Sequence, residues 1–433
     1  MTTGVGMLGC GTVGGGVARL LEERATELAA RAGGPLRLAA VAVRDLTKAR
    51  GPGLAGARLT ASPAEVVRDP EVQIVVELMG GAEPARALVL EALAAGKAVI
   101  TANKLLLAHH GPELFARARE VGVDLAFEGA VGGGIPVVRT LRDALASDRV
   151  RRLSGILNGT SNYVLTRMQR EGLSFDEVLG AAQRLGYAEA EPSLDVDGHD
   201  AAHKLVVLAA LAFGADLPPG DVPTSGLRAL GPIDHAAAER FGYVIKPLAV
   251  AEACDDAAIA MRVGPTLVPR EGLLAGVGGV LNAVLVEGEA LGPCLLSGPG
   301  AGAGPTAVSV VADLLDVAAA RKIGAAGRLT AAVRTAPARV RDPGLAHAPF
   351  YLRFVVRDEP GVLGCITTSL GRAGVSIREL FQQAQRPVDG AEPPVDVVML
   401  THPATHARLA SAVRELDGEG FAVEPARVLP VAP

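Results

Sequence analysis

Residues 5–14 of the chain read Val5-Gly6-Met7-Leu8-Gly9-Cys10-Gly11-Thr12-Val13-Gly14. A short apolar strand runs into a glycine-rich turn, and a helical pattern follows over residues 17–30. This is the G-x-G-x-x-G arrangement in the strand–turn–helix context that binds dinucleotides. Gly9 permits the tight turn, Gly11 lets a pyrophosphate approach the backbone, and Gly14 lets helix and strand pack closely. The stretch therefore predicts a dinucleotide-binding domain at the start of the chain.

Strand and helix patterns alternate after this turn, with apolar strands expected at residues 36–43, 74–77, 98–101 and 123–127. Such alternation predicts a parallel, doubly wound sheet of the Rossmann type, and an α/β fold class. The N–H groups at the start of the first helix would face the phosphates of the cofactor. The expected contacts in this turn are Gly9, Gly11, Thr12, Val13 and Gly14.

The second strand ends in Val43-Arg44-Asp45, which bears on the choice of cofactor. An acid at this strand end usually holds the ribose 2′-OH of NAD, whereas a nearby arginine accommodates the 2′-phosphate of NADP. Arg44 comes first, so we expect NADP to be preferred, with NAD as the alternative. A solvated loop arginine explains Arg44 equally well.

Two further strand ends carry candidate ligand contacts, because ligands of open α/β sheets gather at the carboxyl edge of the strands. One strand end is followed by Gly80, and the other is Thr101-Ala102-Asn103-Lys104. We expect Gly80, Thr101 and Lys104 to contact the cofactor, together with Gly302 in a later glycine-rich turn. A plain surface role for Lys104 is the alternative.

Residues 186–204 concentrate five carboxylates and one lysine directly before an apolar helix over residues 205–213. Asp200 and Lys204 are four residues apart and share one helix face. Lys204 enters a low-dielectric region, where an ammonium needs a partner and where its proton affinity can be tuned for catalysis. An ordinary ion pair at a helix start is the alternative interpretation.

The segment His199-Asp200-Ala201-Ala202-His203 imitates the zinc motif H-E-x-x-H. The general-base glutamate is replaced by an aspartate, and Lys204 directly after the second histidine would repel a metal. We therefore expect these histidines to pack or to form hydrogen bonds.

Composition narrows the class of protein. The 433 residues are 49% hydrophobic and 21% charged with a net charge of −5, which describes a globular protein without a basic surface for nucleic acid. No apolar run reaches the roughly 18 residues of a membrane span, and no leader pattern precedes the first strand. The cysteines form no C-x-x-C pair, which fits a reduced, cytoplasmic protein. They are Cys10, Cys254, Cys294 and Cys365.

The order and identity of the motifs resemble those of homoserine dehydrogenase over residues 4–320. The shared motifs are the glycine fingerprint at residues 9–14, Thr-Ala-Asn-Lys at 101–104, Gly-Gly-Gly-Ile-Pro at 132–136, Leu-Asn-Gly-Thr-Ser-Asn-Tyr at 157–163, Gly-Tyr-Ala-Glu at 186–189, Asp-Val-Asp-Gly-His-Asp-Ala-Ala-His-Lys at 195–204 and the turn at 297–306. Ser161 stands where this family often has Thr, and Glu191 where it often has Asp.

The resemblance implies reversible reduction of L-aspartate 4-semialdehyde to L-homoserine by NAD(P)H, in threonine, methionine and isoleucine biosynthesis. By motif it implies that Lys204 is the proton donor and that Glu189, Asp195, Asp200 and Lys204 bind the substrate. Lys104 remains a rival donor, because spacing alone does not separate the two lysines. We expect a cytoplasmic homodimer or homotetramer.

The resemblance also implies a monovalent cation, Na⁺ or K⁺, held mainly by main-chain carbonyls. The matching positions are Glu128, Val131, Gly133 and Ile135. A hinge between domains would explain the glycines of this segment as well.

The last part of the chain follows a different pattern. Strands are expected at residues 350–356, 375–380, 395–401 and 421–428, with helices at 361–372 and 404–416. This β-α-β-β-α-β order is that of a ferredoxin-like fold. The turn at residues 357–363 resembles an ACT domain, which implies feedback control, most plausibly by threonine, at Asp358, Pro360, Gly361, Val362 and Leu363. An assembly module without a ligand is the alternative.

Four regions are thus predicted. A dinucleotide-binding domain spans residues 1–132, and an α+β catalytic and dimerisation domain spans 133–320, with the helix after residue 305 returning to the first domain. A linker over 321–348 leads to the ACT domain at 349–433.

The sequence argues against three other functions. Aspartate semialdehyde dehydrogenase needs a cysteine nucleophile with a base, but Cys10 lies in the phosphate turn and no other cysteine has a partner pattern. An amino-acid sensor with an inactive dehydrogenase fold would have lost Lys204 or Glu189, and both are present. A bifunctional kinase–dehydrogenase is not expected, since the fingerprint opens the sequence.

Overall fold

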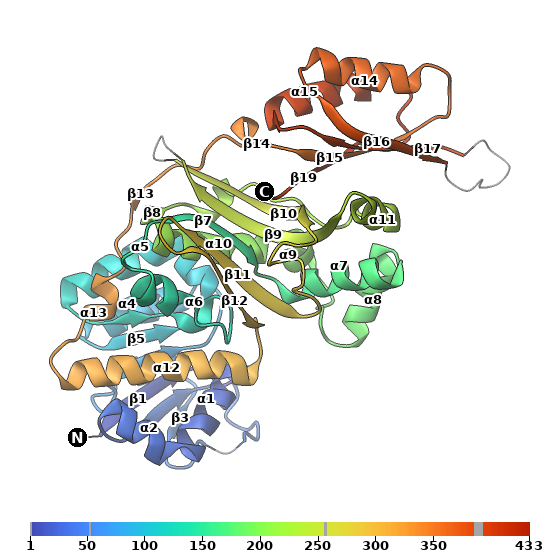
Figure 1. The fold of residues 1–433 in the computed structure, drawn as a ribbon. Helices are drawn as coiled ribbons and strands as arrows, with labels where there is room; N and C mark the ends of the chain where they lie inside the picture. Colours follow the sequence, from blue (N-terminus) through green and yellow to red (C-terminus); the bar gives the residue numbers. More distant parts are fainter. Residues whose placement is uncertain (1, 52, 255–257, 385–392) are drawn as a thin grey trace. The chain divides into compact units, whose positions relative to one another are not determined.

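The computed structural model describes residues 2–51, 53–254, 258–384 and 393–433, coloured along the chain in Figure 1. The chain forms two compact units, each assembled from three segments. Unit 1 contains Met1–Gly159, Asp200–Asp221 and Val280–Arg339, and unit 2 contains Thr160–His199, Val222–Gly279 and Val340–Pro433.

Unit 1 is built on a six-stranded sheet in which all paired strands are parallel. Its order β3-β2-β1-β4-β5-β6 is the strand order of dinucleotide-binding folds, so the predicted doubly wound sheet is confirmed. The strands are β1 (Thr3–Leu8), β2 (Leu36–Ala42), β3 (Arg58–Thr60), β4 (Ile74–Glu77), β5 (Ala98–Thr101) and β6 (Leu125–Ala126).

Helices from both ends of unit 1 share the core of this sheet. Residues of α12 (Ala303–Lys322), such as Val310 and Leu314, pack in one cluster with Val5 and Met7 of β1. A side chain at Gly16 in α1 would come within 2.6 Å of the Ala303 carbonyl, which shows how closely α1 and α12 approach. The helices that follow the strands are α1 (Thr12–Glu23), α2 (Ala25–Ala32), α3 (Pro63–Arg68), α4 (Ala85–Ala94) and α5 (Lys104–Val121).

The expectation for the helix after the glycine-rich turn was wrong in detail. The single helix predicted for residues 17–30 starts earlier, at Thr12, and breaks at Arg24, which is not helical (φ −118°, ψ 23°). The α12 helix is long and apolar enough to span a membrane by length and composition, but 56% of that window is buried inside the structure.

The remaining strands of unit 1 include β7 (Val150–Ile156), β11 (Leu281–Gly288) and β12 (Gly292–Pro299), in which β11 pairs antiparallel with both others. The apolar helix α10 (His199–Phe213) follows the acidic segment. Shorter elements are η1 (Glu128–Ala130), α6 (Val137–Arg139), the π-helical turn η2 (Thr140–Ala144), β8 (Ala215–Asp216), η3 (Pro219–Asp221), α13 (Arg328–Ala331) and β13 (Ala336–Pro337).

Unit 2 contains helices, a long hairpin and the C-terminal module. The hairpin is β9 (Tyr243–Ala253) and β10 (Ile259–Pro269). The helices are α7 (Gly159–Glu171), α8 (Phe175–Arg184), α9 (Ser193–Val196) and α11 (Pro232–Arg240), and short elements η4 (Pro343–Leu345), β14 (His347–Ala348) and β18 (Ala404–Thr405) join the module.

The C-terminal module has the predicted β-α-β-β-α-β order. Its antiparallel sheet β16-β17-β15-β19 carries α14 and α15 on one face (Figure 1). Tyr351, Val398 and Leu400 on the other face join the core of the rest of unit 2. The elements are β15 (Phe350–Val356), α14 (Val362–Arg372), β16 (Ile377–Ala384), β17 (Val395–Thr401), α15 (His406–Asp417) and β19 (Arg427–Pro430).

The strand predicted for residues 421–428 was wrong in position. Ala422 forms only an isolated bridge with Val356, and the regular strand begins at Arg427. Pro425 lies between them, and proline cannot donate a ladder hydrogen bond. The pairing with β15 is therefore interrupted and resumes after the proline.

Candidate active site

The glycine fingerprint adopts the turn that its spacing predicted. Gly9 has φ +98°, and a side chain there would meet the Leu78 carbonyl at 2.7 Å. A side chain at Gly14 would lie 2.5 Å from the Gly9 carbonyl, whereas at Gly11 nothing lies within 4 Å. Of the three fingerprint glycines, Gly11 has open space beside it, where α1 begins at Thr12 with Val13 next to it. This is the geometry that a pyrophosphate at a helix N-terminus requires.

The loop after β2 exposes Arg44 and Asp45. The Asp45 carboxylate accepts hydrogen bonds from the Thr47 hydroxyl (2.6 Å) and the Thr47 N–H (2.8 Å), and these bonds lower its pKa. Arg50, which sequence reasoning did not single out, donates to the carbonyls of Lys48 and Asp45. Burial raises the pKa of Cys10, and the charge of Arg50 partly opposes this rise. Arg44 and Arg50 therefore both belong to this loop, and Arg50 lies near Cys10 of the glycine-rich turn.

Asp200 joins both candidate lysines in unit 1. Its Oδ2 lies 2.6 Å from Lys204 Nζ, and its Oδ1 lies 2.6 Å from Lys104 Nζ. Lys204 also donates to the Leu157 carbonyl at 2.7 Å, and Asn158 Nδ2 donates to Asp200 Oδ2 at 2.9 Å. The structure thus brings Lys104, Lys204 and Asp200 together, although Lys104 and Asp200 are far apart in sequence. The contribution of Asn158 was missed, and its place after β7 in the Leu-Asn-Gly-Thr motif was the available signal.

The two lysines differ in their surroundings. The Lys204 side chain is 11% exposed and Asp200 is 8% exposed, whereas the Lys104 side chain is 40% exposed. Burial alone would raise the pKa of Asp200, but the charges of Lys204 and Lys104 outweigh it and hold the pKa well below its usual range. Asp200 is therefore a carboxylate, and the Lys204 side chain is fixed by two acceptors at the inner end of the group.

Lys104 stands at an unfavourable place in its helix. It is the first residue of α5, where the helix dipole disfavours a positive charge. The helix is capped by Asn103, whose Oδ1 accepts the Leu106 N–H at 3.1 Å. A cation at this position is not explained by helix stability, and its ion pair with Asp200 provides compensation.

The other candidate cofactor contacts are parts of unit 1. Thr101 is fully buried, and its hydroxyl donates to Glu77 Oε2 at 2.6 Å. Gly80 adopts φ +72° in the loop after β4, where its N–H lies 3.4 Å from Glu77 Oε1. Gly302, with φ +127°, precedes the first residue of α12.

Glu189 and Asp195 are residues of unit 2. Glu189 is exposed, and its main-chain carbonyl accepts from Gln183 Nε2 at 3.0 Å. Asp195 lies on α9, and its main-chain carbonyl accepts from Ser161 Oγ at 2.8 Å. The start of α7 is therefore tied to the acidic segment within this unit.

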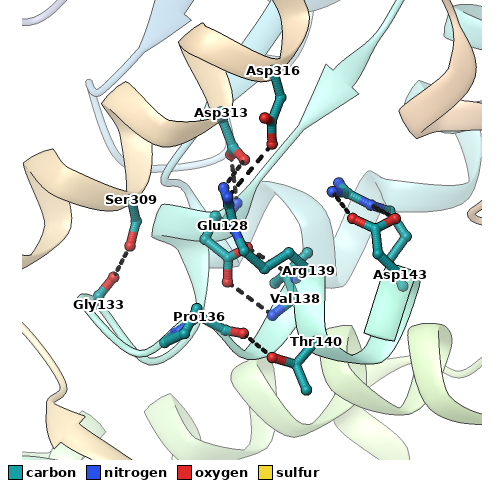
Figure 2. Close-up of polar contacts among 11 residues, drawn as sticks. Glu128, Gly133, Pro136, Val138, Arg139, Thr140, Asp143, Ser309, Asp313 and Asp316 are labelled. Carbon is teal, nitrogen blue, oxygen red and sulfur yellow. Dashed lines mark hydrogen bonds and ion pairs between the residues drawn. The ribbon is translucent and has the colours of Figure 1, made fainter. Parts of the chain in front are cut away.

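The candidate cation segment lies beside α12 in unit 1 (Figure 2). The Glu128 carboxylate accepts the N–H groups of Val138 and Arg139, both at 2.9 Å, and pairs with the Arg139 guanidinium at 3.0 Å. Arg139 also contacts Asp313 and Asp316 on α12. The Glu128 side chain is thus engaged by α6, and the main-chain oxygens of the segment are the other candidate ligands for a cation.

Two of those main-chain oxygens already accept hydrogen bonds. Ser309 Oγ donates to the Gly133 carbonyl at 2.6 Å, as Figure 2 shows, and the Val137 N–H donates to the Ile135 carbonyl at 2.7 Å. A carbonyl oxygen has two lone pairs, so each retains one for a cation. Val131 is fully buried in the same turn. Among the described residues, no group of three or more His, Cys, Asp or Glu side chains is placed to hold a metal.

The candidate effector residues form the exposed turn between β15 and α14. Asp358, Pro360 and Gly361 are exposed, and Val362, the first residue of α14, is buried. Gly361 has φ +94°, a conformation that other residues rarely adopt. Leu363 packs at the edge of the module core.

Two protein-family models and several known proteins match this chain. Residues 9–128 match the NAD-binding domain model of homoserine dehydrogenase, and residues 136–315 match the homoserine dehydrogenase model. The homoserine dehydrogenase of Pseudomonas aeruginosa is 43% identical over 417 residues, which cover 95% of each chain.

Solved structures of homoserine dehydrogenases share the fold of this chain. A homoserine dehydrogenase from Thiobacillus denitrificans has a TM-score of 0.93 at 42% identity and covers 100% of this chain and 98% of its own. A hyperthermophilic archaeal homoserine dehydrogenase in complex with NADPH has a TM-score of 0.62 at 26% identity and covers 73% of this chain and 98% of its own. The chain therefore belongs to the homoserine dehydrogenase family, whose members are NAD(P)-dependent oxidoreductases that act on a CH–OH group.

Proposed function

We propose that Lys204 is the proton donor in the reversible reduction of L-aspartate 4-semialdehyde to L-homoserine, a step of threonine, methionine and isoleucine biosynthesis. The observation that carries this proposal is the sharing of Asp200 by Lys204 and Lys104. The bound nicotinamide supplies the hydride. A charge that develops on the substrate oxygen then needs a fixed donor.

Lys204 suits this role better than Lys104. An ammonium has three N–H donors, and two of those on Lys204 are used by Asp200 and the Leu157 carbonyl. Within the described part of the chain the third has no acceptor, so it can reach the substrate oxygen with little loss of side-chain freedom, since the side chain is already fixed. Lys104, more exposed, is the second candidate and would add positive charge near the same oxygen.

We further propose that Glu189, Asp195 and Asp200 bind the substrate. The substrate carries an ammonium group, and carboxylates complement it. Asp200 is already held by two cations, whereas Glu189 is exposed, which makes Glu189 the carboxylate more accessible to the substrate ammonium.

For the cofactor we propose NADP in preference to NAD, held by Gly9, Gly11, Thr12, Val13, Gly14, Gly80, Thr101, Lys104 and Gly302, with Arg44 at the 2′-phosphate. The exposure of Arg44 and the engagement of Asp45 by Thr47 support this choice, because Asp45 is then less available for a ribose hydroxyl.

We propose that the carbonyls of Glu128, Val131, Gly133 and Ile135 bind Na⁺ or K⁺. Occupation of the Glu128 side chain by α6 supports a site made of main-chain oxygens. Activity measured with the chloride of Na⁺, K⁺ or a bulky organic cation tests this; equal rates in all three would contradict it.

We propose that the C-terminal module, residues 349–433, is an ACT domain that binds threonine at Asp358, Pro360, Gly361, Val362 and Leu363. Its strand order and the exposed turn before α14 support this assignment. We also propose a cytoplasmic homodimer or homotetramer with domain boundaries at residues 132, 320 and 348.

One assay tests the proposed function. The rate of homoserine oxidation is measured with NADP⁺ and with NAD⁺, each with and without threonine. We expect a clear rate with homoserine, a higher kcat/KM with NADP⁺, and inhibition by threonine. No turnover of homoserine with either cofactor would overturn the proposal.

A further inference from the structure

A buried carboxylate outside the lysine–aspartate group links two parts of the sheet edge. Glu77 is the last residue of β4 and is fully buried. Its contacts among the described residues are hydrogen bonds rather than ion pairs: Thr101 Oγ donates to Oε2 at 2.6 Å, and the Met79 N–H donates to Oε1 at 2.8 Å. The Gly80 N–H adds a longer contact at 3.4 Å. Burial raises the pKa of Glu77, and the hydrogen bonds from Thr101, Met79 and Gly80 oppose this rise.

The hydrogen bonds continue from Thr101 to the start of α5. Thr101 Oγ accepts the Asn103 N–H at 3.0 Å, and Asn103 Nδ2 donates to the Gly81 carbonyl at 2.6 Å. Asn103 Oδ1 then caps α5. The carboxylate of Glu77 thus stands in a closed ring that contains the loop at residues 79–81, the end of β5 and the cap of α5.

The next residue after this ring is Lys104. Its Nζ reaches Asp200 Oδ1 at 2.6 Å, although its side chain is 40% exposed and its helix position disfavours a cation. The side chain is held at its tip by this ion pair and at its base by the backbone at the start of α5, so a shift of that backbone strains or breaks the contact with Asp200. A displacement of about 1 Å at a reacting group can lower a rate about 100-fold.

We propose that Glu77 is a positioning residue for the reaction: its buried carboxylate fixes the start of α5 and thereby places Lys104 beside Asp200. The inference rests on the proposed function, because it requires Lys104 to act on the reacting groups. The same carboxylate fixes the loop that carries Gly80, a candidate cofactor contact.

Two near-isosteric variants test the ring. Glu77→Gln keeps one oxygen for the Met79 N–H but places an NH₂ group against Thr101, and Thr101→Val removes the hydroxyl while it keeps the shape. We expect each to lower kcat for homoserine oxidation about tenfold or more. Glu113→Gln is the matched control, because Glu113 lies on α5, the helix that begins at Lys104, and pairs with Arg86 at the surface. Its kcat should equal that of the wild type.

A double-mutant cycle with Lys104→Ala separates positioning from a general loss of structure. If Glu77 acts through Lys104, Glu77→Gln and Thr101→Val will lower kcat much less in the Lys104→Ala background than in the wild type. Equal fold-losses in both backgrounds would overturn the inference, as would a wild-type kcat for Lys104→Ala. If Glu77→Gln does not fold, Thr101→Val carries the same test.

The cycle also distinguishes a failure of the proposed function from a failure of the inference about Glu77. Absence of wild-type turnover with homoserine would refute the proposed function, whereas normal wild-type turnover with additive losses would refute only the role of Glu77. The dissociation constant of NADPH, from quenching of its fluorescence, is measured for every variant, so that a loss of cofactor binding is separated from a loss of turnover.

Discussion

Lys204 Nζ and Asp200 Oδ2 lie 2.6 Å apart, one helical turn from each other on α10. The pair is buried, and the other oxygen of the same carboxylate holds Lys104. A buried ion pair is weak evidence for stability, because the desolvation of both charges offsets their attraction. Its place in unit 1, beside a dinucleotide-binding sheet, favours a catalytic explanation instead.

Arg44→Ala should change the choice of cofactor. Loss of a charged hydrogen bond to the 2′-phosphate is expected to raise KM for NADPH about tenfold and to leave KM for NADH nearly unchanged. Steady-state kinetics with both cofactors check this. Arg37→Ala, which removes a surface arginine of β2 paired with Glu71, is the control and should affect neither value. Equal effects of Arg44→Ala on both cofactors would contradict the assignment.

The stability of unit 2 should depend on His235 in acid. This buried histidine of α11 has no hydrogen-bond partner for either ring nitrogen within the described residues. Burial, together with the nearby charge of Lys246, lowers the pKa of His235 from 6.5 to about 4. The folded state binds the proton less readily than the unfolded state, so the free energy of unfolding falls as the pH drops from 6.5 to 4.

His235→Leu is expected to remove this pH dependence, which amounts to about 3 kcal/mol over that window. Urea unfolding at pH 7 and pH 4 measures it in the wild type and the variant. His347→Leu replaces an exposed histidine of the same unit and should follow the wild-type profile. A His235→Leu profile as steep as that of the wild type would show that the histidine is not held neutral.

The sequence could predict the parts of the fold that have a local cause. Ile74–Glu77 and Ala98–Thr101 were predicted with their observed ends, because each is a short buried apolar run bounded by polar or glycine residues. The strand over residues 421–428 was misplaced, since its pairing with β15 depends on Pro425 and on distant partners.

The same distinction between local and long-range causes applies to the candidate active site. The pairing of Asp200 with Lys204 was predicted from their spacing on one helix. The contact of Asp200 with Lys104 could not be, because nothing in the local pattern of α5 reveals what its first residue meets. The ring around Glu77 was missed for the same reason: it joins the ends of two strands that only the fold brings together.

The most direct measurement of the central claim is the kcat for homoserine oxidation by Lys204→Ala, with NADPH binding followed in parallel. We expect kcat to fall by a factor of about 100 or more while the dissociation constant of NADPH stays at the wild-type value. Lys104→Ala, measured beside it, should retain more activity. Wild-type turnover in Lys204→Ala would contradict the account and remove this lysine from the reaction.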